Sequence, residues 1–539
     1  MSIKKQTIPI IDLFAGPGGL GEGFSSVLNE DGERVFDIRL SIEMEPNAHK
    51  TLELRSFFRK FPPGKAPELY YKLLRQNTEK DREIFRERLF QEYPEEAQKA
   101  KEEAWSAELG GTLFPSEKVD RRIEKALNGE TDWVLIGGPP CQAYSVVGRS
   151  RRQWKDNVDK GDKRVHLYKE YLRIIAGHHP SVFVMENVKG LLSSKVDGKN
   201  MFDLIKADLS NPSAVFPELE SPGYRIYSLV QKPSDYENGN PVYKTNMDYL
   251  IKSEKYGVPQ KRHRVILMGV RADVDYDIEY LNLHKNQVNI EDVIGDLPKI
   301  RGGINRSFDF SELLNGKKKR NYQKLANTDE NWNILIRSFA QEISKWNEMS
   351  GDFYFIQSNE YVLNKGGEYL KFKTPSPKNP LFNWYNDSRL GGVCNHESRT
   401  HLLQDLKRYL FASMFAQMHK RYPRLEEYEM HSDNLMPDHE NAKSGKFADR
   451  FRVQVAHQPA TTITSHISKD GHYFIHYEPA QCRSLTVREA ARVQTFPDNY
   501  LFCGSRTAQF HQVGNAVPPY LALQIGQIVK KIVSHEGNL

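Results

Sequence analysis

The sequence predicts an α/β protein with a doubly wound sheet and a second, smaller domain. Through the first half of the chain, short apolar runs alternate with helical stretches. Each of these runs ends abruptly in glycine, proline or a charged residue. From about residue 272 the strand-and-turn pattern stops, and a polar stretch rich in aromatic and basic residues follows. We therefore expect the sheet in the first half and the second domain after it.

Composition excludes several classes of protein. The 539 residues suffice for two or three domains, and a net charge of +6 permits a polyanionic partner without demonstrating one. Four cysteines in so long a chain form neither a disulfide framework nor a paired zinc motif, which indicates a reducing, cytoplasmic setting and no metal site. No apolar run reaches the roughly 18 residues needed to cross a membrane, so no membrane partner is expected.

The first expected strand, 7–13, leads into a glycine-rich turn. Residues 16–21 fit the pattern G-x-G-x-x-G, a helix follows from about Glu22, and Glu43 ends a second strand. Such a loop lets a ligand approach backbone N–H groups, and the carboxylate accepts hydrogen bonds from ribose hydroxyls. The pattern indicates a nucleoside cofactor but does not distinguish NAD, FAD and S-adenosylmethionine. A tight turn without a ligand is the alternative.

A charged segment and three further strands follow. Residues 48–109 carry mixed charge runs typical of a solvated helical insertion. The three strands are expected at 133–136, 182–185 and 265–269. Ligands of doubly wound sheets bind beyond the carboxyl ends of the strands, where the glycine loop, Glu43, Cys141 and Glu186 all lie.

The segment Pro139-Pro140-Cys141-Gln142 is the strongest chemical signal in the chain. Two prolines fix the backbone at the end of a strand and hold a thiol at a rigid corner. A thiol becomes nucleophilic when it ionises, and the basic residues between 149 and 164 are candidates to favour the thiolate. The alternative is that Cys141 is a small buried apolar residue. We favour the nucleophile.

Six blocks, in order, resemble the DNA cytosine-5 methyltransferase family of the stand-alone bacterial or phage type. They are Asp12–Leu20, Gly137–Ser145, Glu186–Val188, Gln260–Arg264, Arg483–Pro497 and Gly514–Val517. The blocks leave only the charged insertion and the second domain unmatched. The resemblance implies a methyltransferase fold that uses S-adenosylmethionine, together with a target-recognition domain.

The resemblance also implies roles for individual residues. Cys141 adds to ring carbon 6 of cytosine, Glu186 binds N3 and the exocyclic amine, and Arg262 and Arg264 steady the base and the active-site groups. The implied cofactor-binding residues are Phe14, Gly16, Gly18, Gly19, Leu20, Glu43, Met44, Pro139, Asn515 and Val517. One departure stands out. Gly110-Gly111-Thr112 occupies the region where the family carries a Gly-Asp pair that reads the adenine amine.

We expect a catalytic domain at 1–271, a target-recognition domain at 272–482 and a segment at 483–539 that returns to the catalytic domain. Arg483, Thr486, Glu489 and Gln494 are expected to hold the two domains together. The partner is double-stranded DNA, whose target base is flipped into the pocket under a loop formed by 142–164. The basic tract 317–320 is more often a solvated loop than a base reader, so it is not assigned to a site.

The resemblance further implies a monomer with a restriction-modification or defence role, beside a restriction endonuclease encoded separately. Two alternatives stay open. A tRNA-methylating branch shares the cysteine and the glutamate, although it lacks a long second domain. A catalytically silent DNA-binding module would have no need to keep Cys141, Glu186 and 260–264 together.

Overall fold

The computed structural model divides the chain into two compact units. Unit 1 comprises Met1–Tyr70, Glu87–Asn286 and Ala516–Leu539, and unit 2 comprises Tyr71–Arg86 and Gln287–Asn515. The described residues are 7–140, 163–196, 198–274, 276, 278–314, 317–346, 349, 363–372, 376–431, 435–436 and 451–534. Each unit has a hydrophobic core of its own.

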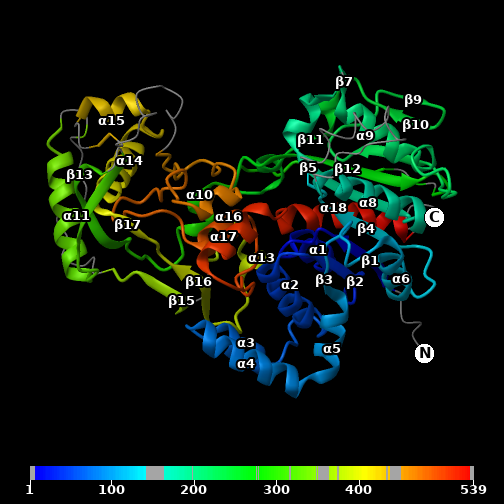
Figure 1. Cartoon of the computed structure of the whole chain (residues 1–539), viewed down its shortest axis with the longest axis horizontal. Helices are drawn as coiled ribbons and strands as arrows, with labels where there is room; N and C mark the ends of the chain where they lie inside the picture. Colours follow the sequence, from blue (N-terminus) through cyan, green and yellow to red (C-terminus); the bar gives the residue numbers. More distant parts are fainter. Residues whose placement is uncertain are drawn as a thin grey trace. The chain divides into compact units, whose positions relative to one another are not determined.

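Unit 1 is built around a sheet whose described part has eight strands, in the order β11-β12-β5-β4-β1-β2-β3, with β8 paired to β12 (Figure 1). Strands β1 to β5 are parallel, whereas β12 runs antiparallel to β5, β8 and β11. The bounds are β1 Ile8–Leu13, β2 Phe36–Glu43, β3 Ala104–Ser106, β4 Val134–Gly137, β5 Val182–Val188, β8 Tyr224–Ser228, β11 Leu250–Lys252 and β12 His263–Arg271. The strand order reverses between β1 and β4, which is where doubly wound sheets bind ligands.

Alternating side chains of the sheet build two core layers, one on each face. Ile11 belongs to one hydrophobic cluster and Ile10 to the other, because successive side chains of a strand point to opposite faces. The first face is covered by α6 (Ser116–Leu127), α8 (Lys163–His178) and α9 (Met201–Ser210). The second face is covered by α1 (Gly19–Ser25) and α18 (Pro519–Val533). The predicted doubly wound α/β fold is confirmed.

The charged segment 48–109 is helical, but much of it is buried rather than solvated. It contains most of α2 (Pro46–Arg59), then α3 (Glu68–Leu74), α4 (Glu79–Glu92), α5 (Pro94–Glu103) and the edge strand β3. Phe57 of α2 is fully buried, and Arg59 forms a 2.7 Å ion pair with the buried Glu103. The expected solvation fails here because buried opposite charges pair with one another, while α4 has the exposed surface that the charge runs predicted.

Unit 2 combines helices with small sheets. Its three-stranded sheet has the order β14-β13-β17, and β15 pairs with β16. The strands are β13 Gly303–Leu314, β14 Lys317–Lys324, β15 Gly366–Lys371, β16 Gly392–Glu397 and β17 Thr400–Leu402; the helices are α10 Ile290–Ile294, α11 Asp329–Ile343, α13 Phe382–Tyr385, α14 Leu403–His419, α15 Leu425–His431, α16 Val487–Val493 and α17 Arg506–Asn515. Helices α11 and α14 supply most of the core.

Two local features of unit 2 are set by side-chain contacts. Residues 461–464 have the β-branched composition that is typical of a strand, but they form none, because the backbone N–H of Thr461 donates to the Gln454 side chain instead of to a neighbouring strand. Arg483 donates to Glu489 within unit 2, at 2.6 and 2.7 Å, and Thr486 caps α16 with Glu489 as its reciprocal partner. These contacts stabilise unit 2 internally.

Within the described part of the chain, no helix is both long and apolar enough to cross a membrane. The same residues contain no group of three or more histidine, cysteine, aspartate or glutamate side chains that could hold a metal ion.

Candidate active site at the carboxyl edge of the unit 1 sheet

The turn after β1 is built from left-handed backbone. Phe14, Gly16 and Gly18 have φ angles of 57°, 57° and 96°. Gly18 stands immediately before α1 and makes no side-chain cap. A side chain added to Gly16 would meet nothing within 4 Å, so the space on this side of the loop is open. The turn therefore presents open backbone surface at the end of β1, as the glycine pattern predicts.

Glu43 ties the end of β2 to this turn. Its Oε2 accepts a hydrogen bond from the Gly16 N–H at 2.8 Å, and its Oε1 accepts one from the Glu45 N–H at 2.7 Å. Burial raises the pKa of Glu43, and these backbone donors oppose the shift. Each oxygen retains a lone pair, so the carboxylate is able to accept hydrogen bonds from a diol. Beside it, the Met44 side chain is 55% exposed and available to an apolar ring.

Gly19 lies against the segment that begins α18. A Cβ at Gly19 would be 2.3 Å from the Val517 carbonyl oxygen and 3.3 Å from Ala516 Cβ, so only glycine permits this approach. The next residue, Leu20, is buried in the core. Val517 is thus brought to the glycine turn within unit 1, whereas Asn515 ends α17 in unit 2.

The end of β3 carries an acidic residue that the sequence analysis did not assign. Ser106 pairs with Glu43, and the Ala107 N–H donates to the Glu43 carbonyl oxygen at 3.3 Å. Glu108 follows at once, and its carbonyl oxygen accepts from the Gly111 N–H at 3.2 Å. Glu108 is thus the carboxylate that follows β3, two residues beyond Ser106, and a Cβ on Gly111 would be 3.3 Å from its Oε2.

The proline corner follows β4. Gly137 lies so close to β1 that a Cβ there would be 2.5 Å from the Leu13 carbonyl oxygen. Pro139 is buried, Pro140 is exposed, and the Pro139 carbonyl oxygen accepts a hydrogen bond from Asn187 Nδ2 at 3.2 Å. Cys141 and the expected loop over the base, 142–164, lie outside the described residues except for 163 and 164. The structure thus describes the chain as far as Pro140, the residue before the thiol.

Glu186 lies beside this corner, at the end of β5. A Cβ on Gly138 would be 3.2 Å from Glu186 Oε2, so the carboxylate and the corner are near neighbours. Glu186 Oε1 is 2.9 Å from Arg264 Nε, although the two groups are not aligned as a hydrogen bond. Glu186 is opposite Ile266 in the antiparallel pair of β5 and β12, which brings the Arg264 side chain within reach. The ion pair positions the carboxylate without satisfying Oε1.

Arg262, just before β12, is 2% exposed. Burial, helped by the like charge of Arg264, lowers the pKa of Arg262 to about 9, and Glu186 opposes the shift. Ser253 Oγ donates to the Arg262 carbonyl oxygen at 2.5 Å and fixes the backbone there. The two predicted arginines therefore differ: Arg264 contacts the carboxylate directly, whereas Arg262 is buried and interacts electrostatically with both Arg264 and Glu186.

Asp12 is a further buried acid near the glycine turn. It is 1% exposed, and neither carboxylate oxygen has a hydrogen-bond partner within the described ranges. Burial raises the pKa of Asp12 to about 8, and the charge of Arg59 opposes the shift. A Cβ on Gly21 would be 3.2 Å from Asp12 Oδ2, so this carboxyl group faces α1 rather than the open side of the turn.

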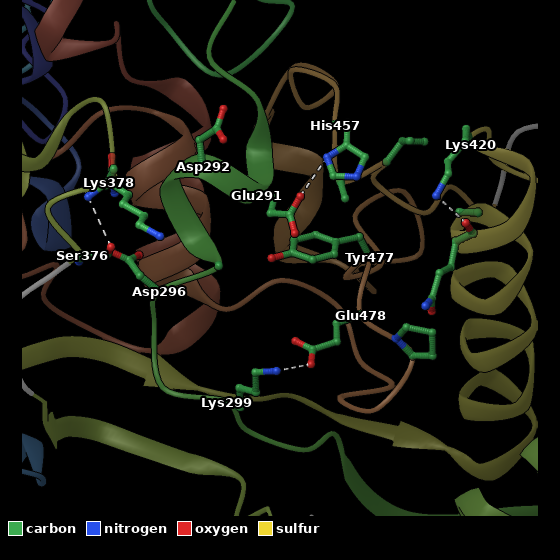
Figure 2. A pocket seen from close by; sticks show the side chains of 17 residues that line it. Glu291, Asp292, Asp296, Lys299, Ser376, Lys378, Lys420, His457, Tyr477 and Glu478 are labelled. Carbon is green, nitrogen blue, oxygen red and sulfur yellow. Dashed lines mark hydrogen bonds and ion pairs between the residues drawn. The ribbon is translucent and has the colours of Figure 1, made fainter. Parts of the chain in front are cut away.

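A cavity of about 610 Å³ lies within unit 2 (Figure 2). Two pairs form among its lining side chains: Glu291 with His457 at 2.9 Å and Lys299 with Glu478 at 2.5 Å. The Tyr477 ring lies between these two pairs in Figure 2. None of the residues predicted for the site lines this cavity. The strand ends of unit 1 therefore remain the candidate active site.

Comparisons with known proteins show which family the chain resembles. A family model described as C-5 cytosine-specific DNA methylase matches residues 81–531. The chain is 33% identical over 545 residues to the type II methyltransferase M.Bpa9945I of Bacillus paralicheniformis, with 97% of this chain and 99% of that protein covered. It is 26% identical to the type II methyltransferase M.DdeI of Desulfomicrobium norvegicum, covering 73% and 71%. It is 25% identical to the DNA (cytosine-5-)-methyltransferase M.ApeKI of Aeropyrum pernix, covering 76% and 83%.

Proposed function

The chain belongs to the C-5 cytosine-specific DNA methylase family, and from this premise we propose how its residues perform the reaction. It is a DNA (cytosine-5-)-methyltransferase. We propose that the methyl donor is S-adenosylmethionine and that Cys141 is the covalent nucleophile. The observation that carries this proposal is the meeting of the glycine turn, Glu43, the proline corner and Glu186 at one edge of a parallel sheet.

The residues at the ends of β1, β2 and β3 fit this cofactor. Gly16 and Gly18 give the methionine part access to the backbone, with Phe14, Gly19 and Leu20 shaping the turn. Glu43 has two oxygens placed to accept the ribose hydroxyls, and Met44 offers an exposed apolar surface to adenine. Glu108 takes the role of the missing family aspartate toward the adenine amine. Pro139, Val517 and Asn515 complete the set. When bound, the cofactor supplies an electrophilic methyl group.

Cys141 starts the reaction as a thiolate. Its sulfur adds to ring carbon 6 of cytosine, and the displaced electron pair makes carbon 5 nucleophilic. Glu186, acting as a carboxylic acid, donates its proton toward N3 and accepts a hydrogen bond from the exocyclic amine, which offsets the negative charge that the ring acquires. Once carbon 5 carries the methyl group, its proton leaves to water, and expulsion of the Cys141 sulfur restores the aromatic ring.

The two arginines position Glu186 in addition to steadying the base. Arg264 holds the carboxylate at 2.9 Å, leaving Glu186 Oε2 on the side of the proline corner. Arg262 adds a buried positive charge that attracts Glu186. Asn187 is a further positioning residue, because its hydrogen bond to the Pro139 carbonyl oxygen fixes the backbone before the thiol.

We propose duplex DNA as the substrate, with the target cytosine flipped out under the loop 142–164. Residues 1–271 and the end of the chain would carry the chemistry, and 272–482 would read the sequence. A separately encoded restriction endonuclease, a monomeric state and a cytoplasmic location complete the proposal. The relatives' names, which include type II methyltransferases, support a restriction-modification role.

Incubation of the full chain with labelled S-adenosylmethionine and either duplex DNA or tRNA tests the proposal. Label in 5-methylcytosine of DNA, and none in tRNA, is the expected result. Label in tRNA alone would establish the RNA-methylating alternative. Absence of label from a DNA library that contains all short sequences would favour the silent binding module.

A further inference from the structure

The basic tract at 317–320 is a strand rather than the solvated loop that its composition suggests. It begins β14, which pairs antiparallel with β13 in a long hairpin. Residues 303–324 contain six basic side chains and two acidic ones. Successive side chains of a strand point to opposite faces, so the arrangement of these charges on the two faces matters more than their number.

The hairpin is anchored at its base and exposed beyond it. Ile304 is fully buried, and the Gln404 side chain of α14 both accepts from the Phe308 N–H at 3.0 Å and donates to Ser307 Oγ at 2.9 Å. Further out, Phe310 is 52% exposed and Leu313 is 79% exposed. The base therefore orients an outer part that is free to meet another molecule.

The register, which shifts between Phe308 and Ser311, gives the hairpin one face that carries basic and aromatic side chains. Residues directly opposite each other in an antiparallel pair share a face, and every second residue along a strand returns to that face. The pairs Arg306–Lys324 and Phe308–Tyr322 therefore lie on one face. Arg320, two residues before Tyr322, shares this face. We call these five side chains the basic–aromatic face.

The opposite face differs in charge. Lys319 pairs with Glu312, their side-chain charges are 3.6 Å apart, and Asn321 Nδ2 donates to Glu312 Oε1 at 2.9 Å. A basic residue on this face thus has an acidic neighbour. Lys319 and Arg320 are adjacent in sequence, carry the same charge and lie on opposite faces.

The basic–aromatic face is ordered by ring contacts. The Arg306 guanidinium lies 4.4 Å from the Tyr322 ring centroid, and the Phe308 and Tyr322 rings are 6.1 Å apart at a steep angle. Stacking holds the Arg306 guanidinium in one orientation and leaves its N–H groups able to donate outward. Fixed guanidinium donors beside further basic side chains suit the phosphates of a polyanion.

We propose that the basic–aromatic face of the β13–β14 hairpin binds the sugar-phosphate backbone of duplex DNA. The proposal rests on the proposed function for the identity of the polyanion, and on charge complementarity for the choice of DNA over a second protein chain. Lysine and arginine contacts to phosphate supply affinity without reading bases. The hairpin therefore adds salt-dependent affinity and leaves sequence preference unchanged.

The test compares Arg320→Gln and Lys324→Gln, on the basic–aromatic face, with Lys319→Gln as the matched control. Binding of the full chain to a labelled duplex is measured from low to high salt. Each phosphate contact contributes about 0.9 to the slope of log affinity against log salt. Arg320→Gln and Lys324→Gln should each lower the slope by about 0.9, and their combination by about 1.8. Lys319→Gln should leave it unchanged.

Equal slopes in all three variants would overturn the proposal, as would a changed sequence preference in methylation. A variant that alters self-association in sedimentation and not the salt slope would assign the face to a second copy and also refute it. Wild-type protein that neither binds nor methylates duplex DNA would instead refute the proposed function. Far-ultraviolet circular dichroism confirms that each variant is folded before binding is compared.

Discussion

Replacing Gly19 by alanine tests whether the approach of Val517 to the glycine turn belongs to the cofactor site. The added Cβ would be 2.3 Å from the Val517 carbonyl oxygen and 3.2 Å from its backbone nitrogen. Both neighbours are backbone atoms, which have no rotamer to change. Gly23 provides the control, because a Cβ there would be 2.4 Å from Ala522 Cβ and from the Pro519 carbonyl oxygen. Both glycines are on α1, one turn apart.

The size of the clash sets the expected losses of stability and cofactor affinity. Restoring an ordinary contact of about 3.4 Å requires the backbone near Gly19 to move by about 1 Å. Overpacking of this kind costs about 1–3 kcal/mol, more than the helical preference of alanine over glycine returns. Both variants should therefore lower the free energy of unfolding by about 1–2 kcal/mol. A shift of about 1 Å in a binding loop also weakens a positioned ligand, so Gly19→Ala should lose at least about tenfold in cofactor affinity.

Calorimetric titration with S-adenosylmethionine and urea unfolding separate the two effects. Gly19→Ala should lose both stability and affinity, whereas Gly23→Ala should lose stability and keep its affinity within about twofold. If Gly19→Ala bound the cofactor as the wild type does, or if both variants lost affinity equally, Val517 would have no special place at the cofactor site.

Glu186→Gln keeps the size of the side chain but not its charge. It should slow methyl transfer in a single turnover by about 10²-fold or more while cofactor affinity stays unchanged. A loss of rate below tenfold would contradict the catalytic role of Glu186. Asn187→Ala removes the buried donor to the Pro139 carbonyl oxygen and should lower the free energy of unfolding in urea by about 1–3 kcal/mol. An unchanged free energy would show that the proline corner keeps its conformation without this hydrogen bond. Burial raises the pKa of Asp12 from 3.8 to about 8, so the folded state favours the protonated acid. Protonated Asp12 makes its full contribution to the stability of the folded state below about pH 4, and this contribution is lost as the pH rises toward 8. Asp12→Asn should therefore gain stability relative to wild type from pH 5 to 8, and parallel curves would refute the shift.

The sequence predicts the sheet and its edge well because both depend on local patterns. Apolar runs that end in glycine or proline identify β1 and β4, and parallel strands bring their ends to one edge whatever the loops between them do. Short strands such as β3 and β11 escape prediction because three residues carry no periodicity. Glu108 was missed for the same reason: its position is defined only by the pairing of β3 with β2.

The second half of the chain was predicted less well because its contacts are not local. The threonine run 461–464 has the composition of a strand, yet among the described residues it pairs with no strand, and Gln454 accepts the hydrogen bond of Thr461. The basic tract reads as a loop in sequence, since only the register with β13 shows that its charges divide between two faces. Buried arginines such as Arg483 look exposed by composition and are paired in the fold.

The proposed mechanism depends on a covalent bond between the Cys141 sulfur and ring carbon 6 of cytosine. A duplex that carries 5-fluorocytosine at the methylated position has no proton at carbon 5 to release, so the adduct should persist after methyl transfer. Mass spectrometry of the digested complex should place the nucleotide on the peptide containing Cys141, and Cys141→Ser should give no adduct. An adduct on another residue, or methylation of DNA by Cys141→Ser at the wild-type rate, would contradict the account.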